Sequence, residues 1–350
     1  MKAVIKKSLG YDNMAFLEAI EPDVYGDKVK IKVAYTGICG SDIHTYKGEY
    51  NNARTPVILG HEFSGEVVAV GPDVKNLKIG DRVTSETTFE TCGTCRYCLD
   101  KDYNLCDNRK GIGTQVNGSM TAFVISREES CHVLPDNVTY KAAALTEPLA
   151  CCVHSALEKT EISEEDVVLV IGPGPIGLLL AQVVRAQGAK VIMSGITQDR
   201  HRLDLAEEIG IDITVDVLSE NLKDIILKET AGYGVDRIFD CSGAIAAVNQ
   251  GLPLMRKTGV FVQVGLFGDK FNQMDQETII QREINYVGSR SQKPSSWKLA
   301  LQLLSREEIK TDQMITKILP LSEWYQGFRD VMAGNEIKVL LESNLEWEKE

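Results

Sequence analysis

The sequence contains no block of lysine and arginine residues. Its 38 basic residues are outnumbered by 50 acidic ones, and the formal net charge at pH 7 is −12. Proteins that bind nucleic acid usually carry a basic patch, so this charge pattern argues against a nucleic-acid partner. Residues 1–7 also lack the apolar run and cleavage site of a signal peptide. We therefore expect a cytoplasmic protein.

Long apolar runs are scarce as well. Residues 167–184 form one stretch of 18 residues without a charge, which is just long enough to span a membrane. The stretch is interrupted by the sequence GPGPIG at 172–177. Glycine and proline residues at these positions favour a buried strand, a tight turn and a buried helix, so we expect no membrane span.

No internal repeat is present, and 350 residues are too many for one ordinary core, so two domains are expected. In residues 1–150, short strands at 29–34, 63–70 and 81–84 are separated by closely spaced glycines. This pattern favours an antiparallel, partly barrel-like domain. A helix is expected at 142–156.

From residue 166 to about 289, strands and helices alternate, which predicts an α/β fold with a parallel, doubly wound sheet. The expected strands are 167–171, 190–194, 235–240 and 259–265, and the expected helices are 177–187, 200–209, 218–230 and 246–255. Further helices at 297–304 and 321–332 and a strand at 338–341 are expected to fold back onto the first domain.

Glycines 172, 174 and 177 fit the pattern G-x-G-x-x-G between an expected strand and an expected helix. The glycines allow a tight turn and a close approach of pyrophosphate to the backbone, beside the free N–H groups of the helix. The pattern predicts binding of NAD or NADP. The residues expected to contact the cofactor are Gly172, Gly174, Pro175, Ile176, Gly177, Gly195, Arg200, Arg202, Val264 and Gly265.

The choice between NAD and NADP stays open. The second strand of a dinucleotide-binding fold usually ends in an acidic residue that binds the ribose hydroxyls of NAD. Here no carboxylate follows the strand until Asp199, and Arg200 and Arg202 come next. These cations would admit the 2′-phosphate of NADP, unless they are ordinary solvated helix residues.

Four cysteines, Cys92, Cys95, Cys98 and Cys106, have the spacing C-x2-C-x2-C-x7-C. This spacing lets four thiolates converge on one tetrahedral metal ion, and clustered cysteines of a cytosolic protein usually bind metal. Zinc is the favoured ion, and an iron–sulfur cluster is the alternative.

A second candidate metal site is assembled from separated residues. Cys39 lies between glycines, His61 and Glu62 follow Gly60, and Glu147 comes at the domain boundary. A catalytic metal needs about three protein ligands and one open position, which a thiolate, an imidazole and a carboxylate would supply.

These motifs together resemble the zinc-dependent medium-chain alcohol and polyol dehydrogenases. The resemblance is carried by the stretches GICGSDIH at 37–44 and GHEFSG at 60–65, by the cysteine loop, and by Glu147-Pro148. It covers essentially the whole chain. It implies a GroES-like catalytic domain formed by residues 1–153 and 289–350, with a Rossmann domain at 154–288. It also implies a structural zinc on the four cysteines and a catalytic zinc at Cys39, His61, Glu147 and Glu62.

Within this family, the carboxylate at Glu147 is similar to that of the sorbitol and polyol branch, and Arg290 matches a polyol-contacting arginine of sorbitol dehydrogenases. Residues 36–50, 85–89, 109–120 and 280–292 look like the bacterial D-arabitol-phosphate dehydrogenases. The resemblance implies oxidation of a polyol phosphate to its ketose phosphate, with hydride transfer to NAD(P). Manganese is an alternative to zinc at the catalytic site because its hard carboxylate ligands accept either ion.

The resemblance also implies roles in proton transfer. Ser41 would receive the proton of the substrate hydroxyl, His44 would pass it outward, and Glu62 would assist at the metal. A substrate phosphate would need a cation, for which Arg290 and Lys293 are the first candidates. Lys47, Arg109 and Lys110 are further candidates that the sequence cannot rank.

Two other readings stay open. One is a dehydrogenase of unphosphorylated polyols or secondary alcohols, of the sorbitol or L-iditol 2-dehydrogenase type. The other is a non-catalytic relative that binds cofactor, although such a protein would be expected to lose Cys39, His61 or Glu147, and all three are present. The family resemblance further implies a homodimer or homotetramer.

Overall fold

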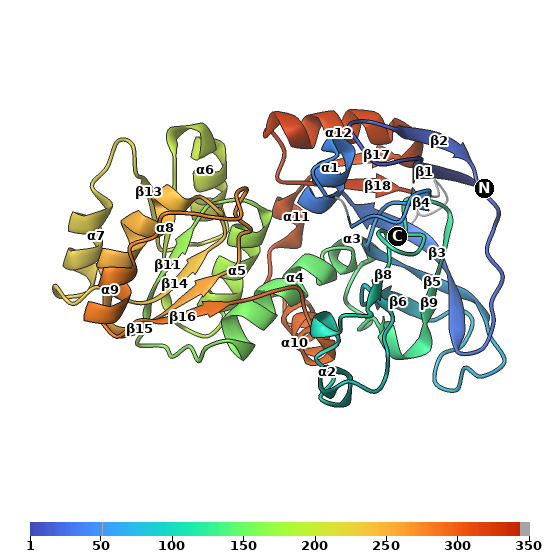
Figure 1. The fold of residues 1–350 in the computed structure, drawn as a ribbon, viewed down its shortest axis with the longest axis horizontal. Coiled ribbons are helices and arrows are strands. Elements are labelled where there is room, and N and C mark those ends of the chain that lie inside the picture. Colours follow the sequence, from blue (N-terminus) through green and yellow to red (C-terminus); the bar gives the residue numbers. More distant parts are fainter. Residues whose placement is uncertain (51, 344–350) are drawn as a thin grey trace. The chain divides into compact units, whose positions relative to one another are not determined.

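Figure 1 shows the computed structural model, which describes residues 1–50 and 52–343. The chain divides into two compact units. Unit 1 consists of Met1–Glu147, Gln292–Arg306 and the chain from Met314 onward, and unit 2 consists of Pro148–Ser291 and Glu307–Gln313.

The domain boundaries expected from the sequence, 153/154 and 288/289, differ from these by a few residues. In addition, Glu307–Gln313 groups with unit 2 rather than with the expected catalytic domain. That domain was expected to reach residue 350, and residues 344–350 lie outside the described chain.

Unit 1 is built on a mixed sheet of seven strands with the order β10-β6-β5-β3-β18-β17, and β9 also pairs with β3. The strands are β3 (Lys28–Gly37), β5 (Glu62–Val70), β6 (Arg82–Ser85), β9 (Phe123–Arg127), β10 (Cys131–Val133), β17 (Ile315–Pro320) and β18 (Lys338–Glu342). A small sheet holds β2 (Met14–Glu18), β1 (Lys2–Lys6) and β4 (Val57–Ile58), and β7 (Thr88–Glu90) pairs with β8 (Lys110–Gly111).

Strand β3 changes character along its length. Its first half alternates between half-buried and buried residues, so that Val29, Ile31 and Val33 enter the core, while its last five residues are all buried. Strand β5 pairs with one edge of β3, and β18, from the far end of the sequence, pairs with the other edge near Gly37. The C-terminal strand therefore joins the N-terminal sheet, as the sequence indicated.

The helices of unit 1 are α1 (Gly40–Lys47), α2 (Arg96–Leu99), α3 (Tyr140–Ala143), α10 (Pro294–Ser305) and α12 (Trp324–Ala333), and α4 (Thr146–Val153) begins in it. Helix α11 (Thr311–Met314) begins in unit 2. Trp324 and Phe328 of α12 pack in one buried cluster with Ile43 and Tyr46 of α1. This packing fixes α1, the helix that begins just after Cys39.

Unit 2 contains a parallel sheet of six strands with the order β13-β12-β11-β14-β15-β16. The strands are β11 (Val167–Ile171), β12 (Lys190–Gly195), β13 (Ile213–Asp216), β14 (Val235–Asp240), β15 (Met255–Gln263) and β16 (Asn285–Gly288). The order reverses between β11 and β14. Ligands of such sheets bind at this reversal, outside the carboxyl ends of the strands.

Helices connect these strands and cover the sheet (Figure 1). They are α5 (Pro175–Arg185), α6 (Arg200–Glu208), α7 (Leu222–Glu229), α8 (Ile245–Gly251) and α9 (Gln276–Gln281). Helix α5 packs against β11 and β12, and its residues Gly177 to Val184 are all buried. This explains the uncharged stretch 167–184, which is one strand and one helix. Among the described residues, no helix has both the length and the apolar character needed to cross a bilayer.

Several expected elements differ in detail. The helix expected at 142–156 is split into α3, α4 and a π-helical turn at His154–Glu158. The helix expected at 218–230 begins only at Leu222, because the Asn221 side chain accepts hydrogen bonds from two N–H groups of its first turn. The helix expected at 246–255 ends early, since Met255 already belongs to β15. The short strands β13 and β16 were not predicted.

Truncation of Phe261 to alanine should destabilise unit 2. Phe261 is fully buried in the core of the sheet and stacks on Tyr286 at 5.0 Å between ring centroids. Removing such a ring costs about 3–5 kcal/mol because a cavity remains. Urea unfolding followed by circular dichroism should show the loss, and Phe271→Ala, at a ring that is 87% exposed, is the control. Equal midpoints for the two variants would contradict this assignment of the core.

Candidate metal and cofactor sites

The four cysteines of the loop come together in unit 1. Their sulfur atoms all lie within 4.8 Å of one another, and Cys98 and Cys106 are buried. The measured Sγ–Sγ distances are 3.4 Å from Cys95 to Cys98, 3.8 Å from Cys92 to Cys98 and 3.7 Å from Cys106 to Cys92. None of the four is in a disulfide.

This geometry fits one tetrahedral zinc ion. Zinc–sulfur bonds of about 2.3 Å in a tetrahedron place the sulfurs roughly 3.8 Å apart. An iron–sulfur cluster spreads its cysteines over several iron atoms, and these sulfurs are too close together for that. Hydrogen bonds from backbone N–H groups of Thr94 and Cys95 also lower the pKa of Cys92 to about 6, which favours the thiolate that binds metal.

The second group of metal-ligating residues is Cys39, His61 and Glu62, whose ligand atoms also lie within 4.8 Å of one another. The fold explains this convergence. Cys39 follows β3 and precedes α1, while His61 comes directly before β5 and Glu62 is its first residue. Since β3 and β5 are paired with Gly37 opposite Glu62, the two ends meet.

Gly37 has to be glycine at this position. A Cβ atom there would lie 2.2 Å from Oε2 of Glu62, and this carboxylate is only 1% exposed. The carboxylate therefore occupies the space that a side chain at Gly37 would fill. Within residues 1–50 and 52–343, Nδ1 of His61 is among the buried side-chain atoms without a hydrogen-bond partner, while Oε2 of Glu62 meets the ammonium group of Lys338. A thiolate, an imidazole and a carboxylate that converge in this way form a donor set that fits a metal ion.

Two neighbours flank the His61 ring. The Ser41 hydroxyl is 3.5 Å from Nε2, and Oδ1 of Asp42 is 3.8 Å from Nδ1. Asp42 is itself held by the N–H of Cys39, at 3.0 Å. Burial lowers the pKa of His61, but the negative charges of Cys39 and Asp42 outweigh it, so the pKa lies well above its ordinary value. A carboxylate beside a ligating histidine also orients the ring.

Lys338 is the buried cation of this site. It is the first residue of β18, it is 4% exposed, and its ammonium group pairs with Oε2 of Glu62 and donates to the carbonyl of Ile38 at 3.3 Å. Burial lowers its pKa, but the charges of Glu62 and Cys39 outweigh it and raise the pKa overall. Lys338 therefore stays charged, and Glu62 stands between it and the other ligands.

Glu147 lies close to this group but not within it. It is buried in α4, and it is absent from the set of ligand atoms that lie within 4.8 Å of one another. Oε1 of Glu147 accepts a hydrogen bond of 3.0 Å from Nε2 of Gln292. Burial raises the pKa of Glu147 to about 7, while the charge of His61 opposes the rise, as do those of Lys338 and Arg109. Whether Glu147 ligates the metal stays a prediction.

The remaining predicted residues of the reaction site are more exposed. His44 is 60% exposed, and its Nδ1 lies 2.7 Å from a carboxylate oxygen of Glu49. Lys293 lies at the start of α10 and forms an ion pair of 3.2 Å with Asp102. Arg290 is an exposed residue of unit 2. These three residues are not part of the buried cluster.

The glycine turn of unit 2 is shaped for a phosphate. Gly172 has φ +94°, a conformation that other residues rarely adopt, and a Cβ at Gly177 would lie 1.9 Å from the carbonyl oxygen of Gly172. A Cβ at Gly174 would meet nothing within 4 Å, so the backbone there is open to a ligand. Gly174 is the N-cap of α5, and Pro175 follows as its first residue. Ile176 is the second residue of this helix.

Asp240, which the sequence analysis did not single out, holds the adjoining loops at the strand reversal. It is fully buried at the end of β14, and its carboxylate accepts hydrogen bonds from Ser242 and from Nε2 of Gln263. Its carbonyl accepts the N–H groups of Val264 and Gly265 at 3.0 and 2.8 Å. Val264 and Gly265 are thus tied to the end of β14, and Ser242 of the adjoining loop lies against Gly172. Their contact with the cofactor stays a prediction.

The end of β12 carries the residues on which the choice of cofactor depends. A Cβ at Gly195 would lie 2.9 Å from Pro173, so the strand end and the glycine turn touch. Arg200 forms an ion pair of 2.8 Å with Asp204, and Arg202 forms one of 3.5 Å with Asp199. Both arginines lie on α6 just beyond the strand, but each is already paired with a carboxylate.

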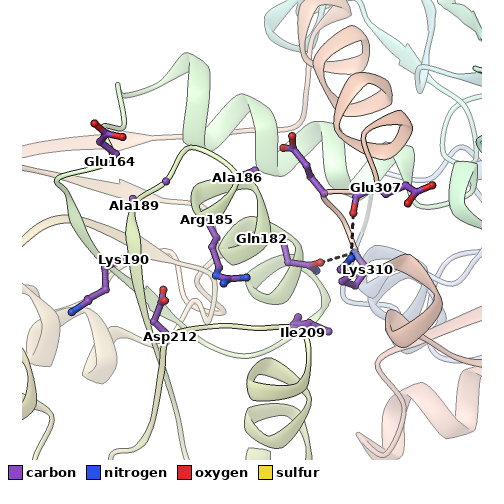
Figure 2. Close-up of a pocket in the computed structure, with 12 residues that line it drawn as sticks. Glu164, Gln182, Arg185, Ala186, Ala189, Lys190, Ile209, Asp212, Glu307 and Lys310 are labelled. Atoms are coloured by element: carbon purple, nitrogen blue, oxygen red, sulfur yellow. Dashed lines mark hydrogen bonds between the residues drawn. The ribbon is translucent and has the colours of Figure 1, made fainter.

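A cavity of about 710 Å³ lies elsewhere in unit 2, near the beginning of β12 (Figure 2). Its lining includes Arg185 and Lys310 but also Asp212 and Glu307, and Gln182 already accepts the N–H of Lys310 at 2.7 Å. The cavity is at the amino end of the sheet and mixes charges of both signs. It therefore does not compete with the glycine turn as the cofactor site.

Four residues of the metal site had no assigned role in the sequence analysis: Asp42, Lys338, Gln292 and Thr87. A signal for Lys338 was available, because a lysine at the head of an apolar strand needs a partner if it is buried. No comparable signal marks Gln292, whose hydrogen bonds reach Thr87 and Glu147, far away in the sequence.

Comparison with known proteins shows the family of the chain. Residues 26–136 match the model of the alcohol dehydrogenase GroES-like domain, and residues 175–306 match that of zinc-binding dehydrogenases. D-arabitol-phosphate dehydrogenase of Enterococcus avium is 58% identical, over 99% of this chain and 98% of that protein. Sorbitol dehydrogenase of Halalkalibacterium halodurans is 49% identical, over 97% of this chain and 99% of that protein.

Among solved structures, one of a protein assigned as a zinc-binding dehydrogenase, from Sinorhizobium meliloti 1021 and bound to NADP, superposes with a TM-score of 0.88. Its sequence is 31% identical, and the match covers 97% of this chain and 98% of that one. The similarity therefore extends over both units of the chain.

Replacing Cys98 with serine should remove one zinc ion per chain and leave the other in place. Cys98 contacts two other sulfurs of the loop, and the loss of one thiolate opens the tetrahedron. Elemental analysis of the purified protein measures the result. Cys131→Ser, in β10 of the same unit and outside both metal groups, is the control and should keep the full metal content. Unchanged zinc in Cys98→Ser, or bound iron, would overturn the assignment.

Proposed function

Since this chain belongs to the zinc-dependent medium-chain dehydrogenases, in their polyol branch, we propose that it interconverts a polyol phosphate and its ketose phosphate. The substrate we favour is D-arabitol phosphate, and NAD or NADP is the hydride acceptor. The family resemblance and the α/β fold class inferred from the sequence are confirmed by these similarities. The enzyme class, an NAD(P)-dependent alcohol or polyol dehydrogenase, is confirmed with them.

One observation carries the proposed activity, namely the convergence of Cys39, His61 and Glu62, whose ligand atoms all lie within 4.8 Å of one another. A purely structural metal site would enclose its ion with four strong ligands, as the cysteine loop does, whereas one of the three converging groups here, Glu62, is shared with Lys338. The choice of substrate is supported by the identity of 58% to a D-arabitol-phosphate dehydrogenase over nearly the full length of both chains.

Cys39, His61 and Glu147 would hold a zinc ion, which would supply Lewis acidity toward a substrate hydroxyl, and the glycine turn would hold the nicotinamide cofactor that would supply the hydride acceptor. The chain's own residues handle the proton. We assign the proton of the substrate hydroxyl to the Ser41 hydroxyl, which lies 3.5 Å from Nε2 of His61. His44 lies one turn further along α1 and is 60% exposed, so it passes the proton to solvent.

Glu62 has a second partner besides the metal group. Its pairing with the buried Lys338 holds the carboxylate when it is not a ligand, because a buried carboxylate without a counter-charge is costly. We therefore assign Glu62 a supporting role, in which its carboxylate either ligates the metal or pairs with Lys338. Glu147, held by Gln292, is assigned as the further ligand of the site.

The alternative substrate class is an unphosphorylated polyol, since the chain is also 49% identical to a sorbitol dehydrogenase. Manganese remains the alternative metal at the catalytic group. We also propose a cytoplasmic homodimer or homotetramer, on the basis of the family resemblance. Light scattering after size-exclusion chromatography tests the oligomeric state, and a monomeric mass would contradict it.

A substrate panel tests the proposed function. Steady-state rates with arabitol, sorbitol and galactitol, each free and phosphorylated, should be measured with NAD and with NADP. The phosphorylated form of arabitol should have the highest kcat/KM. If the free polyols are oxidised at least as well as the phosphates, the unphosphorylated alternative replaces the proposed substrate.

Replacing Cys39 with serine tests the metal group. Changes around a metal site commonly cost about 10–100-fold in metal affinity or activity even without loss of a ligand, so turnover should fall by more than roughly 100-fold. Binding of NADH, followed by fluorescence, should persist because the glycine turn belongs to unit 2. Cys131→Ser is again the matched control. Normal turnover by Cys39→Ser would refute the catalytic metal site.

A further inference from the structure

The proposed substrate carries a phosphate, yet the chain as a whole is strongly acidic. Recognition of an anion by such a protein requires a local cation. Of the five cations named from the sequence, three lie in unit 1 in or beside the segment of the cysteine loop, namely Arg109, Lys110 and Lys293. The sequence could not rank them, and in the structure they contact different kinds of group.

Two of the three form ion pairs with exposed carboxylates. Lys110 pairs with Glu90, and both side chains are about half exposed, at 43% and 52%. Lys293 pairs with Asp102 at 3.2 Å, with exposures of 30% and 33%. A phosphate that bound either lysine would have to compete with a carboxylate already in contact with it.

Arg109 makes a different set of contacts. Its Nε donates to the hydroxyl of Thr88 at 2.9 Å, and its Nη2 donates to the hydroxyl of Thr87 at 2.5 Å. Both threonines are buried, with 6% and 3% exposure, whereas Arg109 itself is partly exposed. Two fixed hydroxyls therefore set the plane of the guanidinium group while solvent still reaches the side chain.

The same hydroxyl connects Arg109 to the metal site. Nε2 of Gln292 donates to the Thr87 hydroxyl at 3.3 Å and to Oε1 of Glu147 at 3.0 Å. The guanidinium group is thus joined to the Glu147 carboxylate through two side chains, all of them in unit 1. The charge of Arg109 also acts to lower the pKa of Glu147, which agrees with their proximity.

We propose that Arg109 binds the phosphate group of the substrate and thereby makes the enzyme prefer phosphorylated over free polyols. This proposal rests on the proposed function. A guanidinium group suits the task because its planar set of N–H donors matches two phosphate oxygens. Thr87 and Thr88 are positioning residues that hold the guanidinium group of Arg109. Gln292 links the position of that group to the position of the Glu147 carboxylate.

The test compares Arg109→Met with Arg109→Lys, using D-arabitol phosphate and D-arabitol as substrates. The measured quantity is the ratio of kcat/KM for the phosphorylated substrate to kcat/KM for the free polyol. Loss of hydrogen bonds to a charged group should lower this ratio by roughly 10- to 100-fold in Arg109→Met. Arg109→Lys keeps the positive charge but lacks the planar set of N–H donors of the guanidinium group, so it should lower the ratio by only about 3- to 10-fold.

The ratio separates recognition from a structural role. If Arg109 only supported Thr87 and Glu147, both substrates would lose rate together, the ratio would stay constant, and the proposal would be overturned. Lys110→Met, at the neighbouring residue, is the matched control and should leave the ratio within about twofold, the size expected for an exposed ion pair. A collapse of the ratio in Lys293→Met but not in Arg109→Met would assign the phosphate to Lys293 instead.

Inhibition by inorganic phosphate gives a second readout, the inhibition constant, which does not depend on how fast the variant turns over its substrate. It should inhibit oxidation of D-arabitol phosphate competitively, and its inhibition constant should rise about tenfold in Arg109→Met. An unchanged constant would overturn the assignment of Arg109. By contrast, a wild-type enzyme without preference for the phosphorylated substrate would overturn the proposed function itself.

Discussion

The buried carboxylate of Glu62 is the constraint on which the arrangement of unit 1 depends. A charge out of water costs several kcal/mol unless it is paired, and Glu62 is almost fully buried. It requires a glycine opposite it on β3, the ligands Cys39 and His61 on one side, and the ammonium group of Lys338 on the other. The register of three strands is therefore tied to one ionised group.

The two metal groups of unit 1 are constructed in opposite ways. The cysteine loop draws its ligands from one short segment, so its geometry depends on local turns. The group around Glu62 draws on β3, β5 and β18, and its neighbour Glu147 is fixed through Gln292. The ligand geometry of a local site tolerates changes elsewhere in the fold, whereas the ligand geometry of the second site changes with any shift of the sheet. This difference suits a structural role for the first and a reactive role for the second.

The same difference explains how far the sequence could be interpreted. The cysteine spacing, the glycine turn and the alternation of strands and helices in unit 2 are short-range patterns, and they predicted the fold class and the main candidates. The contacts of Lys338, Gln292 and Arg109 join separate segments of the chain, so the sequence could name Arg109 as a candidate and mark Lys338 as needing a partner but could not identify the groups that they meet. The strands β13 and β16, which escaped prediction, are four residues long and form the two edges of the parallel sheet. The early end of α8 depends on Met255 pairing with β14, a tertiary effect.

The pairing of β18 with β3 has a consequence for the order in which the protein becomes active during synthesis. Nascent domains generally fold as they emerge from the ribosome. The cysteine loop is complete once Cys106 has been made, and unit 2 has all its strands by Gly288. Lys338, however, is made last, so Glu62 lacks its counter-charge until then. The dinucleotide site can form early, while the reactive metal site waits for nearly the whole chain.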